Sequence, residues 1–155
     1  MAEIQSTIVM EAPLSVVWPL ARDVERYPEI MPDLQSLKII ESQDQGGGTQ
    51  RVVSEWKGRI KQLNRSIDWV EEDIWSEAEH TCHFWQLRGD FSEYKGDYLF
   101  SDEGGKTRVQ LKVTYRFDIP LLGALMHKVI QKIMQDNANN MLASLKAEAE
   151  KRAAQ

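Results

Sequence analysis

The sequence lacks several features by which classes of protein are usually identified. Its 155 residues contain one cysteine, Cys82, so no disulfide can form within the chain. A single cysteine agrees with a reducing compartment. Acidic residues outnumber basic residues, 24 to 19, which gives a net charge of −5. The basic residues are dispersed instead of forming a stripe, and we therefore expect no nucleic-acid partner.

The sequence also lacks the signals for membrane insertion, secretion and bound metal. No apolar run approaches the about 18 residues that a membrane-spanning helix needs, and residues 1–6 do not resemble a secretory signal. We expect a soluble cytoplasmic protein. His80 and Cys82 could share a strand face, but no third ligand lies near them in the sequence. The glycines at 46–48 suit a hairpin better than a phosphate-binding loop, so we expect neither a metal nor a cofactor.

The most informative feature present is a long apolar stripe near the C-terminus. Apolar residues recur at spacings of three, four and seven over residues 117–155, which predicts one long amphipathic helix. Asp118 is placed to act as its N-cap, and Pro120 lies in the predicted first turn. A helix of about 28 residues is roughly 42 Å long, enough to cross a curved sheet. The stripe consists of Ile119, Leu122, Met126, Val129, Ile130, Ile133, Met134, Met141, Leu142 and Leu145.

The two faces of this predicted helix have different expected surroundings. We expect Met126, Ile130 and Met134 to pack against the concave face of a sheet. Three stripe residues are methionines, whose flexible side chains tolerate an irregular or changing partner surface. They are therefore either ordinary core residues or part of a cavity wall. The side chains expected to face solvent are Lys128, Gln131, Lys132 and Gln135.

Upstream of this helix the sequence predicts mainly strands. Alternation predicts a first strand over residues 3–11, and helical spacing predicts a short helix over residues 14–24. Pro28 and Pro32 mark a second short helix or turn. Six further strands follow, separated by short turns whose spacing is typical of antiparallel hairpins. The six predicted strands are 34–41, 50–56, 59–71, 81–87, 94–100 and 108–115, with one of the turns at 57–58.

Several stretches of the chain resemble a known superfamily. Residues 11–13, Glu-Ala-Pro, and residues 23–32, Asp-Val-Glu-Arg-Tyr-Pro-Glu-Ile-Met-Pro, resemble the polyketide cyclase/dehydrase and coenzyme Q-binding families of the START-like (SRPBCC) superfamily. Residues 85–91 and 96–98 resemble the central hairpin of the same families. The resemblance spans essentially the whole chain. It implies an α+β helix-grip fold over residues 1–155, a single domain with an antiparallel sheet of about seven strands curved around the C-terminal helix and two short helices after the first strand.

The resemblance leaves three kinds of function open, because these families share a cavity far more than they share a reaction. The first is binding of a bulky hydrophobic or aromatic small molecule, such as a lipid, a quinone or a polyketide-like compound. The alternative is an aromatase/cyclase or dehydratase that promotes aldol ring closure of a poly-β-ketone. The third is an interaction module with a vestigial cavity. A transient contact with a membrane or a polyketide synthase is compatible with the first two, and the sequence does not indicate an oligomeric state.

Alternation along the predicted strands groups the candidate ligand-binding residues. Bulky apolar ligands require aromatic walls and a few polar groups that orient them. Because successive side chains on a strand point to opposite faces, parity shows which residues share a face but not which face is inside. The candidates are Tyr27, Met31, Trp56, Trp69, Phe84, Gln86, Tyr98, Tyr115, Met126, Ile130 and Met134.

The enzyme alternative depends on Arg65 and Ser66. In the resembled cyclases an arginine, a serine and tyrosines are thought to assist ring closure, since a cation stabilises enolate charge and a hydroxyl relays protons. An ungapped alignment places the family's arginine near Trp69, and Arg65 has the same parity four residues earlier. Arg65 and Ser66 are therefore the candidate catalytic residues. The acidic residues 71–73 are expected only to mark the end of a strand.

Overall fold

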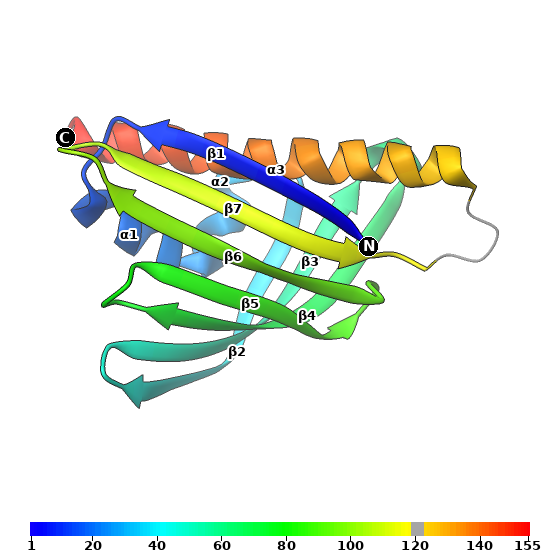
Figure 1. Ribbon diagram of the computed structural model, residues 1–155, viewed down its shortest axis with the longest axis horizontal. Coiled ribbons are helices and arrows are strands. Elements are labelled where there is room, and N and C mark those ends of the chain that lie inside the picture. The colour runs from blue at the N-terminus through cyan, green and yellow to red at the C-terminus, as the bar shows by residue number, and fades with distance from the viewer. Residues whose placement is uncertain (119–122) are drawn as a thin grey trace.

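The computed structural model describes residues 1–118 and 123–155, and its centre is one curved sheet (Figure 1). Each strand pairs antiparallel with its neighbours in the order β1-β7-β6-β5-β4-β3-β2. Alternating apolar residues turn one face of this sheet towards a common core. The strands are β1 (Ala2–Met10), β2 (Leu34–Gly46), β3 (Thr49–Ile60), β4 (Arg65–Ser76), β5 (Thr81–Gly89), β6 (Glu93–Asp102) and β7 (Thr107–Arg116).

The helices lie at the two ends of the chain. α1 (Leu14–Arg22), η1 (Val24–Arg26) and α2 (Tyr27–Ile30) follow β1, and α3 (Ala124–Ala153) is the last element. Figure 1 shows α3 running alongside β1, with α1 near its C-terminal end. This is the expected helix-grip fold, a seven-stranded antiparallel sheet with a long C-terminal helix and two short helices after the first strand. No helix within residues 1–118 or 123–155 is long and apolar enough to cross a membrane.

α3 attaches to the sheet through an apolar face and several polar bonds. Ser6 Oγ donates a hydrogen bond to Asn139 Oδ1 at 2.7 Å, and Lys146 Nζ donates one to the Val9 carbonyl at 3.1 Å. Both bonds fix the helix to β1. The buried residues of α3 are Ile130, Ile133, Ala138, Leu142, Leu145 and Ala149.

Most of the predicted helix faces are observed. Lys128, Gln131 and Lys132 are exposed as expected, and Ile130 is buried. Gln135 differs, because its amide donates a hydrogen bond to the Gln5 carbonyl at 2.8 Å and so contacts β1. Of the two predicted methionine contacts, Met134 packs against the core, whereas Met126 is half-buried in the first turn and is not among the residues packed there.

The predicted start of the terminal helix is wrong. Gly123 is the N-cap of α3, and Phe117 and Asp118 are not helical. The Asp118 backbone N–H instead donates a hydrogen bond to Ser92 Oγ at 3.1 Å. A tertiary contact therefore overrides the capping preference of aspartate at this position. Ile119, Pro120 and Leu122 lie outside the described residues.

The predicted turn at residues 57–58 is also wrong, because β3 continues through Gly58 to Ile60. The chain reverses instead at η2 (Lys61–Leu63) and at Asn64, which has a φ of 47°. Gly58 pairs with Ile67, and a Cβ at position 58 would lie 3.3 Å from Ile67 Cγ2. The absence of a side chain at Gly58 therefore allows β3 and β4 to pack closely. Close approach of a neighbouring group is, like a turn or a bulge, a common reason for glycine at such a position. As a result, residues 71–73 lie inside β4 and not at its end.

Candidate functional site

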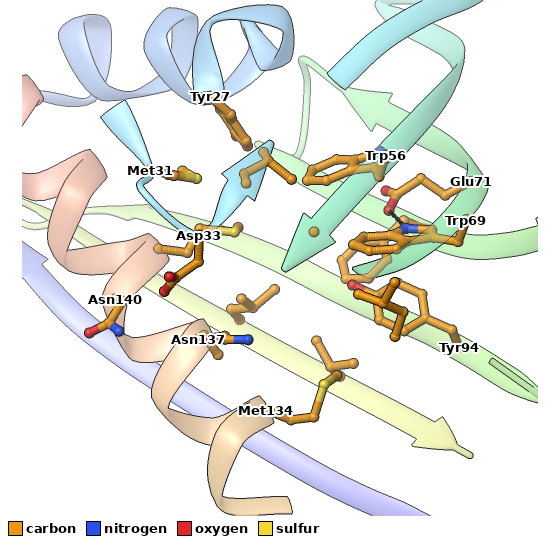
Figure 2. A pocket seen from close by; sticks show the side chains of 18 of the residues that line it. Tyr27, Met31, Asp33, Trp56, Trp69, Glu71, Tyr94, Met134, Asn137 and Asn140 are labelled. Atoms are coloured by element: carbon orange, nitrogen blue, oxygen red, sulfur yellow. Dashed lines mark hydrogen bonds between the residues drawn. The ribbon is translucent and has the colours of Figure 1, made fainter. Parts of the chain in front are cut away.

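A cavity of about 160 Å³ lies between the inner face of the sheet, α2 and α3 (Figure 2). This volume is similar to that of an engineered apolar cavity of about 150 Å³ that binds benzene. One aromatic ring can therefore enter without rearrangement of the walls. Its aromatic lining residues are Tyr27, Trp56, Trp69, Trp75, Phe84, Phe91, Tyr94 and Tyr98, and α3 contributes Met134, Asn137, Ala138, Asn140, Met141 and Ser144.

The aromatic rings of the wall hold one another in place. Trp56 and Trp69 are paired in the β3–β4 register and stack with ring centroids 5.4 Å apart and an interplanar angle of 16°. Trp56 Nε1 donates a hydrogen bond to Ser54 Oγ at 2.8 Å. Phe91 and Tyr94 stack beside them, with centroids 4.6 Å apart. Because each ring has a packed or bonded partner, this part of the wall is preformed.

Two glycines and a bulge leave room for these rings. Gly89 pairs with Trp69, and a Cβ at position 89 would lie 2.5 Å from Trp69 Cα. A Cβ at Gly96 would lie 2.4 Å from Phe84 Cζ, so the Phe84 ring can lie over β6 only beside a glycine. The register between β4 and β5 shifts between Val70 and Glu71. Bulges of this kind re-aim side chains and are common beside functional sites.

A pair of carboxyl groups lines the inner part of the cavity. Glu71 and Asp73 are only 4% and 2% exposed. Trp69 Nε1 donates a hydrogen bond to Glu71 Oε1 at 2.8 Å, which Figure 2 shows. Within the described residues Asp73 Oδ1 has no hydrogen-bond partner, and neither has the hydroxyl of Tyr98. Acceptor and donor groups are therefore available inside an otherwise apolar space.

Burial changes the proton affinity of both carboxyl groups. It raises the pKa of Asp73 from its ordinary 3.8 to about 6. Burial, followed by the charge of Asp73, raises the pKa of Glu71 well above its ordinary range. A side-chain hydrogen bond with Glu71 partly opposes the rise in the pKa of Asp73. With a pKa of about 6, Asp73 is mainly ionised near neutral pH. Burial also raises the pKa of the Tyr98 hydroxyl, which remains protonated.

This pair was not among the expected site residues, because residues 71–73 were expected only to mark the end of a strand. In the structure Trp69, Glu71, Asp73 and Trp75 occupy alternate positions of β4 and all line the cavity. The sequence does contain a signal for this pair, because the four residues occupy alternate positions and so share one face of the strand. Two carboxyl residues between two tryptophans are rare on a face exposed to solvent. Glu72, at the opposite parity, instead forms an ion pair with Arg51.

The outer end of the cavity is polar. Asp33, Arg59, Asn137 and Asn140 line both the cavity and an adjoining hollow of about 430 Å³. In Figure 2, Asn137 and Asn140 lie on the helix side of the space with Asp33 nearby. Arg59, which is exposed, is the one arginine or lysine among the described residues that line the cavity. Charges of both signs are therefore found at the mouth, whereas the charged residues of the inner lining are the carboxyl groups of Glu71 and Asp73. The remaining residues of the hollow are Lys61, Gln62, Asp136 and Asn139.

The structure brings most of the candidate ligand-binding residues together. Gln86 is committed elsewhere, since its amide donates a hydrogen bond to the Phe91 carbonyl at 2.8 Å and accepts one from the Phe91 N–H at 3.2 Å. Tyr115 is buried with its ring centroid 6.3 Å from that of Phe91, outside the set that lines the cavity. Met126 also lies outside this set. The candidates that line the cavity are Tyr27, Met31, Trp56, Trp69, Phe84, Tyr98 and Met134.

The candidate catalytic residues do not line the main cavity. Arg65 and Ser66 are exposed at the start of β4. With Ile130, another candidate ligand-binding residue, they line an adjoining hollow of about 10 Å³, too small for an organic ligand. This hollow shares Ile60, Ile67 and Met134 with the wall of the main cavity. The position at which the family's arginine is expected is occupied by Trp69, whose ring forms part of the main cavity wall.

Comparison with known families identifies the chain. Residues 10–142 match the family model described as polyketide cyclase / dehydrase and lipid transport. The chain belongs to this family. Its helix-grip fold is the one expected from its resemblance to the START-like superfamily. Among curated proteins, no matching relative is found.

Solved structures with the same fold cover nearly the whole chain. A crystal structure of TTHA0849 from Thermus thermophilus has a TM-score of 0.85 and 30% identity, and the match covers 96% of this chain and 97% of that one. Zhui aromatase/cyclase from Streptomyces sp. R1128 has a TM-score of 0.84 and 18% identity over 97% and 94% of the two chains. A START superfamily protein from Mycobacterium smegmatis has a TM-score of 0.78 and 16% identity over 96% and 97%. At these lower identities the likeness concerns the fold alone.

Proposed function

We propose that this family member binds a bulky hydrophobic or aromatic small molecule in the cavity between the sheet and α3. The observation that carries the proposal is the preformed aromatic wall around a space of about 160 Å³. An apolar ligand that enters this space would remove its own surface and the aromatic wall from water, which contributes about 25 cal/mol per Å² of apolar area buried.

The shape of the site favours a ligand with an apolar body that lies between the aromatic rings and a polar part at its outer end. The inner space accepts one ring or a similar length of chain. A larger ligand would extend into the polar hollow beside Asp33, Arg59 and Asn137. Lipids, quinones and polyketide-like compounds all have this form, and we propose them as the ligand classes. Transient contact with a membrane or a synthase, and a cytoplasmic location, remain predictions from the sequence.

The alternative proposal is catalysis of ring closure, since a protein of the same fold is the Zhui aromatase/cyclase. Such a reaction needs a preorganised cation near the developing enolate oxygen. Arg65 is exposed and lines only the small adjoining hollow, and Arg59 lies at the mouth. The geometry therefore favours binding. Should this chain be a cyclase through Arg65, Arg65→Ala would lower turnover about 10² to 10³ fold in a reconstituted polyketide assay.

Tryptophan fluorescence provides a direct test of ligand binding. Titration with 1,4-naphthoquinone should quench the emission saturably, because Trp56 and Trp69 line the cavity. The variant Trp69→Phe should lose a large part of this quenching. Trp85→Phe is the matched control, since Trp85 is on the opposite parity of β5 from Phe84 and does not line the cavity. Emission that stays unchanged up to the solubility limit of the quinone would contradict the proposal.

A cavity-filling pair of variants provides a second test. Ser144 lines the cavity from α3, whereas its neighbour Ala143 is exposed. Ser144→Phe should occupy the space and weaken naphthoquinone binding at least about tenfold, which corresponds to about 1.4 kcal/mol. Ala143→Phe should leave the affinity unchanged. Equal affinities of the two variants would show that the quinone binds elsewhere.

A further inference from the structure

Two polar groups inside the cavity lack partners in the unliganded protein. Asp73 Oδ1 and the Tyr98 hydroxyl are buried and have no partner in good hydrogen-bonding geometry among the described residues. Glu71 and Tyr27 lie beside them and affect the pKa values of Asp73 and Tyr98. Buried polar atoms without a partner are rare in native proteins, and each one calls for an explanation. Both residues line the cavity, so a bound molecule can supply what the protein does not.

No cation of the described chain compensates the carboxyl pair. The lining of the cavity contains no lysine, and its one arginine, Arg59, lies at the mouth. Arg22 stacks on the ring of Trp75 with its Cζ 5.9 Å from the centroid, but its guanidinium forms an ion pair with Glu77 at 2.9 Å. The negative charge of Asp73 is therefore surrounded mainly by aromatic rings.

The register places this charge far from the mouth. Gly58, next to Arg59, pairs with Ile67, whereas Asp73 pairs with Val52 on β3 and with Phe84 on β5. Asp73 lies six positions after Ile67 on β4, which corresponds to about 20 Å along the strand. A ligand that contacts Asp73 must therefore enter from the mouth with its contacting end first and pass the stacked rings of Trp56 and Trp69.

We propose that the inner end of the cavity is a subsite for a ligand head group that donates a hydrogen bond to Asp73 Oδ1. This inference rests on the proposed function. The head group is an ammonium or a hydroxyl, because both donate to a carboxylate and both can contact the Tyr98 hydroxyl. The surrounding ring faces attract cations in addition. The pKa of Asp73, about 6, is consistent with an acceptor here, because this carboxyl group is mainly ionised near neutral pH.

Three probes of nearly equal size separate the two head groups from simple apolar binding. Benzylamine carries an ammonium, benzyl alcohol a hydroxyl and toluene neither, and one ring fits the cavity. Affinities are measured at pH 7.5 by amide chemical shifts. A hydrogen bond to a charged group changes affinity by about ten- to a hundredfold. We expect benzylamine, benzyl alcohol or both to bind at least tenfold more tightly than toluene, and the better of the two identifies the head group.

Variants at adjacent positions of β4 assign the effect to Asp73. Asp73→Leu should abolish the preference for the donor probes and retain toluene binding. Glu72→Gln is the control, because Glu72 lies on the opposite face and pairs with Arg51. It should leave all three affinities unchanged. Should Asp73→Leu not fold, Asp73→Asn removes only the charge and should reduce the preference for benzylamine.

The outcomes distinguish failure of the subsite from failure of the proposed function. If toluene binds as tightly as both donor probes, or if Asp73→Leu keeps the donor preference, the subsite is overturned while ligand binding in the cavity stands. If none of the three probes binds, both inferences are overturned. A loss of all binding in folded Asp73→Leu would also overturn the subsite, because an apolar ring should not need the carboxylate.

Discussion

At the scale of single residues, Gly89 determines where the ring of Trp69 can lie. Gly89 has a φ of 147°, and a Cβ there would lie 2.5 Å from Trp69 Cα and 2.6 Å from Trp69 Cβ. These are backbone-proximal atoms that cannot move without displacing β4. A substitution at Gly89 therefore disturbs the wall of the cavity as well as the local backbone.

This geometry gives a prediction for two glycine variants. Gly89→Ala should lower the free energy of unfolding by about 3 kcal/mol, because backbone strain and steric overlap act together. Gly104→Ala is the control, since Gly104 also has a positive φ of 70° but has nothing within 4 Å of an added Cβ. It should lower the free energy by about 1 kcal/mol. Urea denaturation measures both, and similar values for the two would show that overlap with Trp69 contributes little.

The sequence predicted the apolar residues of the site better than the polar ones. Trp56 and Trp69 could be chosen because large aromatic side chains on strands are mostly buried on one side. Asp73 could not be chosen in the same way, since charged residues are almost always at the surface. Its burial depends on the register of β4 with β3 and β5. That register is a long-range property, which the sequence of one strand does not contain.

At the scale of secondary structure, α3 forms one wall of the cavity and closes the core. Its middle and C-terminal turns were predictable, because the 3.6-residue period is sustained over many turns. Its first turn was not predictable from capping preferences, as Gly123 and not Asp118 is the N-cap. The strands show the same pattern, since β3 was predicted but its end at Ile60 was missed.

The packing of α3 gives a second prediction. Leu142 is fully buried, and Leu142→Ala should lower the free energy of unfolding by about 2–5 kcal/mol through lost contacts and a new cavity. Lys132→Ala is the control on the exposed face of the same helix, where Lys132 pairs only with Asp136. It should change the free energy by at most about 0.5 kcal/mol. Thermal and urea unfolding check both, and a small effect at Leu142 would contradict the observed docking of α3.

At the scale of the whole molecule, the order of elements was sufficient to predict the helix-grip fold. One strand, two short helices, six strands and a long helix have few compact arrangements, and the family motifs narrowed them further. The interior of the fold was not predictable to the same degree. Cavity volume depends on how side chains from β3, β4, β5, β6 and α3 meet, and on glycines such as Gly96 that leave space for a ring.

The buried carboxyl pair also links the stability of the whole molecule to pH. An acid whose pKa is raised on folding binds more protons in the folded state than in the unfolded state. For Asp73 this holds between its ordinary value of 3.8 and its folded value of about 6, so stability falls as the pH rises through this window. The difference corresponds to about 3 kcal/mol. Glu71, whose pKa is also raised, acts in the same direction above pH 4.5.

The last prediction compares the pH dependence of Asp73→Asn with that of the native chain. Asparagine does not titrate, so the variant should gain stability relative to the native chain by at least about 2 kcal/mol between pH 4 and pH 7. The difference between the two proteins cancels the carboxyl groups that do not interact with Asp73. Glu71, whose pKa is raised by the charge of Asp73, adds to the difference in the same direction. Asp73→Leu should show the same change in relative stability with pH, although its free energy of unfolding at any one pH will differ from that of Asp73→Asn. Urea unfolding at pH 4, 5, 6 and 7 measures it, and a difference that stays constant or shrinks with rising pH would show that Asp73 is not desolvated in the folded protein.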